Sequence, residues 1–260
     1  MSVTTNGNAE TSPSRVLIRD NFVWDEQDAY LFDVDGTLLR SRDRIHVNSF
    51  VSSVRQVTGF EISLNGVMLN GATDTAILRD AFVLAGIPLE SWEPQLETIL
   101  EAMRQAVTSR RGEMQLWTMP GVQEVLRHLA DKGALLGLAT GNLEVIGWTK
   151  VEQVGLREWF RFGGFSDRFA LRNEMVAHAA AKARELIGNQ LRAGVCVVGD
   201  TPRDIEAARA NGLPVIAVAT GNYRFEELAE FDPEVCTSSL AALLAETEVE
   251  TDPEDVGVRM

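Results

Sequence analysis

The chain has 260 residues, 45% of them hydrophobic and 24% charged, so it can bury one sizeable core and still form a smaller second unit. A formal net charge of -14 argues against a nucleic-acid partner, because contact with phosphate backbones needs a positive surface. No segment approaches the roughly 18 uninterrupted apolar residues of a membrane span, and the first residues lack the apolar centre of a secretory signal. We expect a cytoplasmic protein, a monomer or homodimer, with no membrane partner.

The two ends of the chain are polar. Residues 1–20 are rich in Ser, Thr, Asn and Gly, and residues 246–260 are acidic. Neither segment carries enough apolar surface to offset the entropy that is lost when a chain becomes ordered. We therefore predict a disordered N-terminal tail and an acidic C-terminal tail.

Four short apolar runs, each ending in small or acidic residues, predict buried parallel strands: YLFDVDG, ALLGLATGN, GVCVVGD and LPVIAVATG. Segments of helical period separate these runs, at residues 121–132, 143–154, 173–187 and 204–210. Alternation of strand and helix is typical of a doubly wound, mostly parallel sheet of the α/β class. We predict that residues 21–40 and 119–245 form this Rossmann-like core.

A long interval, residues 41–118, interrupts the alternation. It shows helical periods at 47–58, 75–84 and 94–110, divided by glycines, and no clear strand. We predict an inserted helical cap domain.

Two carboxylates stand at the end of the first apolar run. Asp33 and Asp35 are separated by one residue, so on a strand they share a face, and a bend at Gly36 can present backbone amides to an anion. A plain Asp-Gly turn at the strand end is the alternative interpretation.

Polar residues also follow the second and third runs. Thr140, Gly141 and Asn142 end the second, while Asp200 and Asp204 flank the junction between the third run and its helix. Each group alone is typical of a turn or a helix cap. The carboxyl ends of parallel strands meet at one crevice, however, so we expect the three groups to converge there.

The segments DVDGT at 33–37 and GDTPRD at 199–204, with a cap-sized gap before LATGN, resemble the haloacid-dehalogenase-like superfamily. The segment WTKVEQVGLREWF at 148–160 is similar to the family's helix and its Gly-Leu turn. The resemblance covers roughly residues 28–245 and is specific to the capped, phosphoglycolate phosphatase-like branch.

The resemblance implies that Asp33 is the nucleophile that attacks phosphorus. It implies that Asp35 first protonates the leaving oxygen and then acts as the base for water. Thr140 and the amide of Gly141, with Asn142 beside them, are expected to bind the phosphoryl oxygens. The implied Mg²⁺ ligands are the Asp33 carboxylate, the Asp35 backbone carbonyl, Asp200 and Asp204.

The chemistry supports these residue types. A carboxylate approaches a phosphate dianion only when cations offset their repulsion, and oxygen-only ligands suit Mg²⁺. An acid with a pKa near neutrality serves best, and crowding by neighbouring carboxylates is expected to raise the pKa of Asp35.

The family's lysine, expected between the second and fourth motifs, is missing from its usual place. Lys182 lies too close to Asp200, whereas Arg172 precedes the helix at about the right distance. We assign Arg172 to hold the phosphate and the nucleophile, with Arg168 as the fallback; the alternative is that both are surface charges.

The segment LNGATDT at 69–75 resembles the loop that contacts substrate in capped relatives. Asn70, Thr73 and Asp74 are expected either to touch the leaving group or to form a plain helix N-terminus capped by Thr73. For His46, at the start of the predicted cap, an exposed residue at a helix start is the favoured interpretation, and a residue that faces the substrate is the alternative.

Single residues also distinguish the different reactions that members of this superfamily catalyse. A dehalogenase would lack an acid at the position of Asp35, and a phosphonatase would need a cap lysine, which residues 41–118 do not contain. A Mg²⁺-dependent phosphatase acting on a small phosphorylated metabolite is the favoured interpretation, with phosphoglycolate as a first guess by resemblance. A sugar phosphomutase and a non-catalytic protein that binds a phospho-ligand or a partner are the alternatives.

Overall fold

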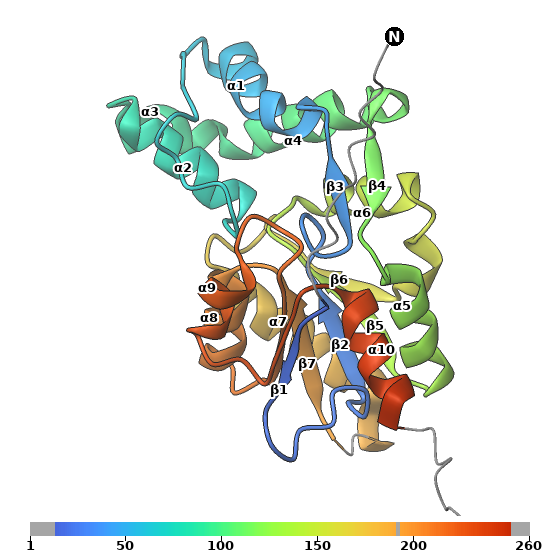
Figure 1. The fold of residues 1–260 in the computed structure, drawn as a ribbon. Helices are drawn as coiled ribbons and strands as arrows, with labels where there is room; N and C mark the ends of the chain where they lie inside the picture. Colours follow the sequence, from blue (N-terminus) through green and yellow to red (C-terminus); the bar gives the residue numbers. More distant parts are fainter. Residues whose placement is uncertain (1–13, 191–192, 251–260) are drawn as a thin grey trace, which may run out of the picture.

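A computed structural model describes residues 14–190 and 193–250, and its centre is a seven-stranded sheet in the order β1-β9-β8-β7-β2-β5-β6 (Figure 1). All neighbouring strands are parallel except β1 and β9, which are antiparallel. The strands are β1 (Val16–Ile18), β2 (Ala29–Phe32), β5 (Leu135–Ala139), β6 (Phe162–Gly164), β7 (Val195–Gly199), β8 (Val215–Val218) and β9 (Val235–Thr237).

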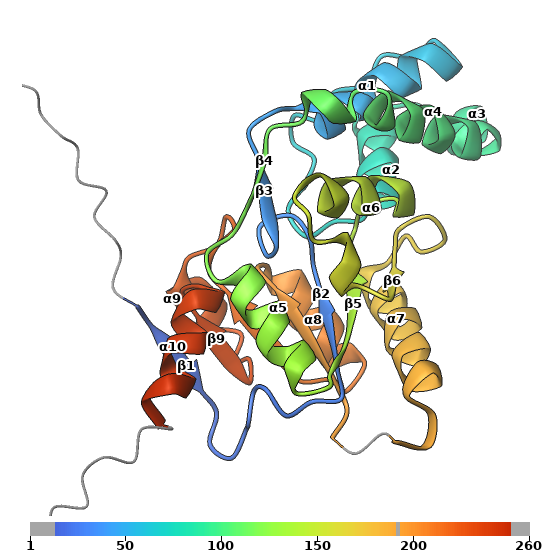
Figure 2. The same cartoon turned by 90° about the vertical axis from the view of Figure 1, so that its right-hand side faces the viewer.

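The sheet is buried on both faces. On β2, Tyr30 and Phe32 pack into one apolar cluster, whereas Ala29 and Leu31 pack into the other. One face is covered by α5 (Val122–Asp131), α6 (Glu144–Gln153) and α10 (Leu240–Glu250). The other is covered by α7 (Arg172–Ile187), α8 (Pro202–Ala210) and α9 (Phe225–Ala229) (Figure 2). The predicted α/β fold class is therefore confirmed.

The helices between β3 and β4 form a separate layer above the sheet, which we call the helical unit (Figure 2). It consists of α1 (Ile45–Thr58), α2 (Asp74–Leu84), α3 (Leu89–Trp92) and α4 (Leu96–Thr108). Its own apolar cluster includes Phe82 and Trp92, whose rings stack with centroids 4.5 Å apart. Leu143 and Ile146 at the start of α6 belong to the same cluster, so the helical unit packs directly on the core.

Two short antiparallel strands, β3 (Leu39–Ser41) and β4 (Leu116–Thr118), join the helical unit to the core. The sequence did not predict β4, because three residues are too few to show a strand period. Short 3₁₀ turns lie at Glu93–Gln95, Arg111–Glu113, Arg157–Trp159 and Gly188–Gln190.

Both predicted tails include residues that belong to the fold. Residues 16–18 form β1, an edge strand that pairs with β9, and Ser238 N donates to Arg15 O at 2.8 Å. The run Val-Leu-Ile suits such an edge, although its polar surroundings concealed it. Helix α10 continues to Glu250. The rest of the two predicted tails, 1–13 and 251–260, lies outside the described residues.

Among the residues that the structure describes, no helix is both long enough and apolar enough to cross a membrane.

Gly141, two residues after the end of β5, lies where the backbone of the core closely approaches that of the helical unit. An added Cβ there would lie 2.2 Å from the carbonyl oxygen of Ala72, and Asp74 N donates to Gly141 O at 2.7 Å. A backbone atom cannot swing aside as a flexible side chain can. Any side chain at position 141 must therefore displace the loop that enters α2.

We expect Gly141→Ala to lower the free energy of unfolding by about 1–3 kcal/mol, because overpacking displaces backbone. Urea unfolding would measure the change. Gly112→Ala is the control, since an added Cβ there meets nothing within 4 Å. Equal stability of the Gly141→Ala variant and the wild type would show that the contact relaxes without strain.

Candidate active site

The chain bends sharply where β2 ends. Asp33 N still donates to Val198 O at 2.9 Å, and the backbone then turns at Gly36, whose φ is 93°. An added Cβ at Gly36 would lie 2.4 Å from Asp200 Oδ2, so only glycine fits both this conformation and this space. The bend leaves Asp33 buried and opens 45% of the Asp35 side chain to the cavity.

Three buried carboxylates meet beside this bend. Oxygen atoms of Asp33, Asp200 and Asp204 lie within 4.8 Å of one another. Burial raises the pKa of Asp33 to about 6, and Asp204 adds to this increase while Arg172 opposes it. Burial and the charges of Asp33 and Asp204 also raise the pKa of Asp200 well above its usual value. The cluster therefore favours an added positive charge, and its oxygen-only donors fit Mg²⁺.

Asp204 is already hydrogen-bonded through both oxygens. Oδ2 accepts from Thr201 N at 3.1 Å and from Thr201 Oγ1 at 2.7 Å, which ties the first turn of α8 together. Oδ1 accepts from the Arg172 guanidinium. Of the predicted metal residues, Asp204 is thus the one whose oxygens are most engaged with protein donors.

Arg172 is the first residue of α7, and its guanidinium is buried in the site. Nη2 lies 3.1 Å from Asp33 Oδ1 and 2.5 Å from Asp204 Oδ1, while Nη1 donates to Gly71 O at 3.1 Å. Burial opposes its charge, but the two carboxylates outweigh burial and raise the pKa of Arg172. Arg168 is exposed, and Lys182 pairs with Glu185 on the outer face of α7.

The end of β5 lies opposite the Asp33 bend. Thr140, Gly141 and Asn142 all line the cavity, as the predicted convergence of strand ends required. Asn142 Nδ2 donates to Thr140 Oγ1 at 2.6 Å and to Asp35 Oδ2 at 2.8 Å. The Asn142 amide therefore orients Asp35, while the Thr140 hydroxyl lies at the cavity wall.

Lys150 is a site residue that the sequence interpretation missed. Its Nζ lies 2.8 Å from Asp35 Oδ1 and 2.7 Å from Asp35 Oδ2, and its side chain is only 4% exposed. A signal was present: Lys150 follows Leu143 by seven residues and Ile146 by four, so it shares their buried face of α6. A lysine on a buried helix face needs a hydrogen-bond acceptor close by, most often a carboxylate, so its position indicated a charged partner in the interior.

The predicted increase in the pKa of Asp35 is wrong. The loss of water around the carboxyl does raise this pKa, but the Lys150 ammonium, with the His46 imidazole beside it and hydrogen bonds from Lys150 and Asn142, outweighs this desolvation and lowers the pKa below its usual value. Asp35 is therefore a carboxylate at neutral pH, whereas Asp33 two residues earlier has its pKa raised.

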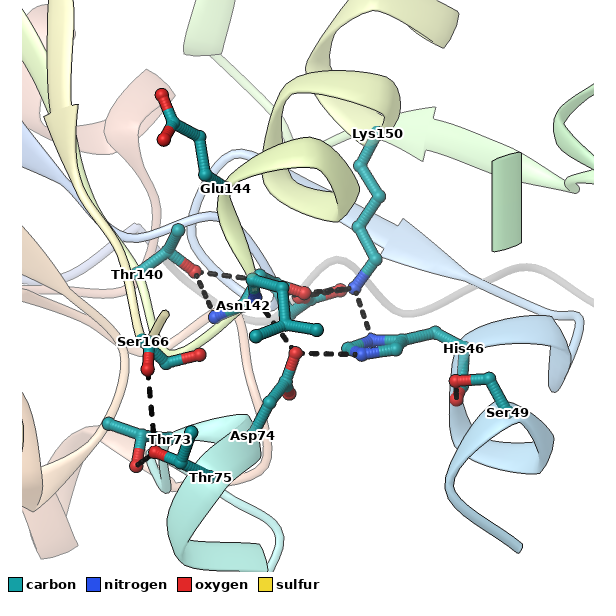
Figure 3. Close-up of polar contacts among 12 residues, drawn as sticks. His46, Ser49, Thr73, Asp74, Thr75, Thr140, Asn142, Glu144, Lys150 and Ser166 are labelled. Atoms are coloured by element: carbon teal, nitrogen blue, oxygen red, sulfur yellow. Dashed lines mark hydrogen bonds and ion pairs between the residues drawn. The ribbon is translucent and has the colours of Figure 1, made fainter. Parts of the chain in front are cut away.

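The prediction of an exposed His46 is also wrong. Its side chain is 15% exposed, with Nδ1 3.1 Å from Lys150 Nζ and Nε2 3.1 Å from Asp74 Oδ2 (Figure 3). His46 is the second residue of α1, and the first turn of this helix faces the cavity.

The loop that enters α2 contributes unequally to the site. Asn70 lines the cavity and accepts from Asn222 Nδ2 at 2.8 Å. Thr73 is the N-cap of α2: its Oγ1 accepts from Ala76 N at 3.1 Å and donates to Ala170 O at 2.7 Å. For Thr73 the structure favours the helix-cap alternative. Asp74, next to it, lines the cavity.

A cavity of about 560 Å³ lies between the core and the helical unit, large enough for a small molecule. The core contributes Asp33, Asp35 and Thr140 to its wall, and the helical unit contributes His46 and Asp74. A ligand at the nucleophile would thus be enclosed by both parts.

Comparison with known proteins agrees with this geometry. The model of the haloacid dehalogenase-like hydrolase family matches residues 30–218. A phosphoglycolate phosphatase of Xanthomonas campestris pv. campestris is 31% identical over 209 residues, covering 79% of this chain and 87% of that protein. One of Mesorhizobium japonicum is 34% identical over 127 residues, 49% of this chain, and the match spans only 55% of that protein.

A solved structure, a predicted phosphoglycolate phosphatase from Haemophilus somnus, superposes with a TM-score of 0.60 at 21% identity, covering 85% of this chain and 98% of that one. At this identity the likeness concerns the fold alone. Because the family model matches residues 30–218, which is most of the chain, the protein belongs to the haloacid dehalogenase-like hydrolase family.

Proposed function

We propose that the protein is a Mg²⁺-dependent phosphatase that hydrolyses a small phosphate monoester through a phosphoryl-aspartate at Asp33. The observation that carries the proposal is the Asp33 carboxylate, buried at the base of the cavity between Arg172 and two further carboxylates. Relatives named phosphoglycolate phosphatase support this class and suggest a small phosphorylated acid as a first substrate to test.

In the first half-reaction an Asp33 oxygen attacks phosphorus, and the bond from phosphorus to the leaving oxygen breaks. Arg172 offsets the repulsion between the two anions. Asp33, Asp200 and the Asp35 backbone carbonyl, with Asp204, would hold Mg²⁺, which would supply further positive charge at the phosphoryl group. Thr140 and the Gly141 amide are proposed to hold phosphoryl oxygens.

Asp35 gives a proton to the leaving oxygen. Because Lys150 keeps Asp35 ionised before substrate binds, this proton has to arrive with the substrate, and a phosphate monoester near its second pKa of about 6 carries one as the monoanion. In the second half-reaction the Asp35 carboxylate takes a proton from water. The water oxygen attacks phosphorus, the bond from phosphorus to Asp33 breaks, and inorganic phosphate leaves.

We expect Asp33→Asn to lower phosphate release from 4-nitrophenyl phosphate by about 10⁴-fold or more, because an amide is a poor nucleophile. The variant should stay folded, as circular dichroism would show. Asp80→Asn, on the exposed face of α2, is the matched control. Retained turnover in Asp33→Asn would exclude the covalent mechanism.

Stability should depend on pH and Mg²⁺ through Asp33. Its pKa is raised to about 6 in the folded state, so the folded protein holds a proton that the unfolded chain has lost between about pH 4 and pH 6. The free energy of unfolding therefore falls as pH rises through this window. Without metal, the loss attributable to Asp33 approaches roughly 3 kcal/mol above pH 6.

Urea unfolding of the wild type and Asp33→Asn at about pH 4 and pH 7 isolates this contribution, because the variant lacks the group. With a chelator present, the wild type should lose stability between about pH 4 and pH 7 relative to the variant. With Mg²⁺ present, the wild type should regain stability at about pH 7, because the metal binds the folded protein. A wild type that Mg²⁺ does not stabilise at either pH would argue against a metal at these carboxylates.

Arg172→Ala should lower kcat/KM by about tenfold to a thousandfold, since the guanidinium offsets charge at the nucleophile and the phosphate. Arg172→Lys, which keeps one charge but loses the bidentate contact to Asp204, should recover part of the loss. Arg168→Ala is the control on the exposed loop. If Arg168→Ala matched Arg172→Ala, the assignment of the phosphate-binding cation would be wrong.

A further inference from the structure

Lys150 is a buried cation that does not contact Asp33. Its ammonium lies against both oxygens of Asp35, 2.7 Å and 2.8 Å away, and against Asn142 Oδ1 at 2.8 Å. Asn142 closes the ring by donating through Nδ2 to Asp35 Oδ2. A buried ion pair is weak evidence for stability, because desolvation offsets most of the attraction. The arrangement does hold the Asp35 carboxylate in one orientation.

The donors of Lys150 determine the tautomer of His46. An ammonium has three hydrogens and no acceptor, so His46 Nδ1, 3.1 Å from Nζ, must accept. Nε2 then carries the imidazole hydrogen and donates to Asp74 Oδ2 at 3.1 Å. Asp74 Oδ2 also accepts from Leu143 N at 2.9 Å, so Asp74 is held by the start of α6 (Figure 3).

The network crosses the boundary between the two parts of the molecule. Asp35, Asn142 and Lys150 belong to the core, whereas His46 begins α1 and Asp74 begins α2 in the helical unit. The two oxygens of Asp35 lie too close together to take separate hydrogens from one ammonium, so Asp35, Asn142 and His46 are three acceptor groups for three hydrogens. The third acceptor group, His46, is therefore present only while the helical unit rests on α6. Without it, one donor of a buried ammonium loses its partner, which weakens the hold on Asp35.

We propose that Lys150 is a positioning residue for Asp35, and that His46, oriented by Asp74, makes this positioning depend on the docking of the helical unit. The inference rests on the acid and base roles of Asp35 in the proposed function. Proton transfer needs heavy atoms within about 2.6–3.2 Å, so a displaced carboxylate loses most of its effect. The Asp35 carboxylate is thus held in its reactive orientation when the helical unit closes the cavity around a substrate.

Esters that differ in their leaving group separate this role from a merely structural one. Alkyl phosphates need a proton on the leaving oxygen, whereas 4-nitrophenolate leaves without one. Lys150→Met should lower kcat/KM by about tenfold to a hundredfold for an alkyl phosphate and by less than about threefold for 4-nitrophenyl phosphate. Lys182→Met, on the outer face of α7, is the control and should change neither.

Two variants of His46 test the link to the helical unit while keeping Lys150. His46→Leu removes the acceptor and should show the same dependence on the leaving group, to a smaller extent. His46→Asn can place an amide oxygen near the former Nδ1 and should restore much of the loss. Equal losses on both esters, or no recovery in His46→Asn compared with His46→Leu, would overturn the proposal.

Nitrogen NMR of the imidazole rings tests the network without turnover, and the chain has only three histidines to assign. The His46 ring should carry its hydrogen on Nε2, with Nδ1 as the acceptor, and Lys150→Met should shift its Nδ1 signal. A hydrogen on Nδ1 would refute the network. Wild-type protein that releases no phosphate from any ester would refute the proposed function, whereas uniform losses in an active enzyme would refute only the positioning role.

Discussion

The site is organised around the burial of negative charge at the carboxyl end of the sheet. Asp33, Asp200 and Asp204 lie within 4.8 Å of one another in a region with little solvent. Burial first, and then the charges of the neighbouring carboxylates, raise the pKa values of Asp33 and Asp200, so the cluster favours cations or protons between its members. The tight turn at Gly36 and the insertion of Arg172 are both arrangements that accommodate this cluster.

Two separate cations give two neighbouring aspartates different properties. Arg172 contacts both Asp33 and Asp204, and burial outweighs its charge, so the pKa of Asp33 stays raised. Lys150 serves Asp35 alone, and with His46 it lowers the pKa of that carboxyl. Divergent environments for paired carboxylates are the usual basis for assigning them different roles in a reaction. Here the difference arises from α6 and α7, which approach the strand end from different sides.

The helical unit contacts both of these cations. Its Gly71 carbonyl accepts from Arg172, and its His46 accepts from Lys150. A further ion pair joins Arg104 on α4 to Asp167 of the core at 2.8 Å. Polar contacts of this kind break and form more readily than an apolar core, which suits a unit that has to admit a ligand to the cavity beneath it. The helical unit is therefore part of the electrostatics of the site as well as its cover.

The local sequence pattern was sufficient to predict the alternating strands and helices of the core and the polar residues that directly follow the strands. Apolar runs ending in polar residues predicted the parallel strands β2, β5, β7 and β8, and the helical periods predicted the flanking helices α5 to α8. Asp33, Thr140 and Asp200 followed as strand-end residues that had to meet. Spacing before α7 indicated Arg172. The three-residue strands β1, β3, β4, β6 and β9 were not predicted, because three residues show no period and are stabilised only by their partners.

Only the tertiary structure decided which charges pair. Lys150 lies 115 residues from Asp35 along the chain, and His46 lies 28 residues from Asp74, so no local pattern connects them. The sign of the shift in the pKa of Asp35 depended on that pairing, since desolvation alone would have raised it. The sequence by itself determined which residues stand at the strand ends, because alternation is a short-range property. Their protonation and orientation were decided by the packing of α6 and the helical unit, because electrostatic interactions depend on distance in space.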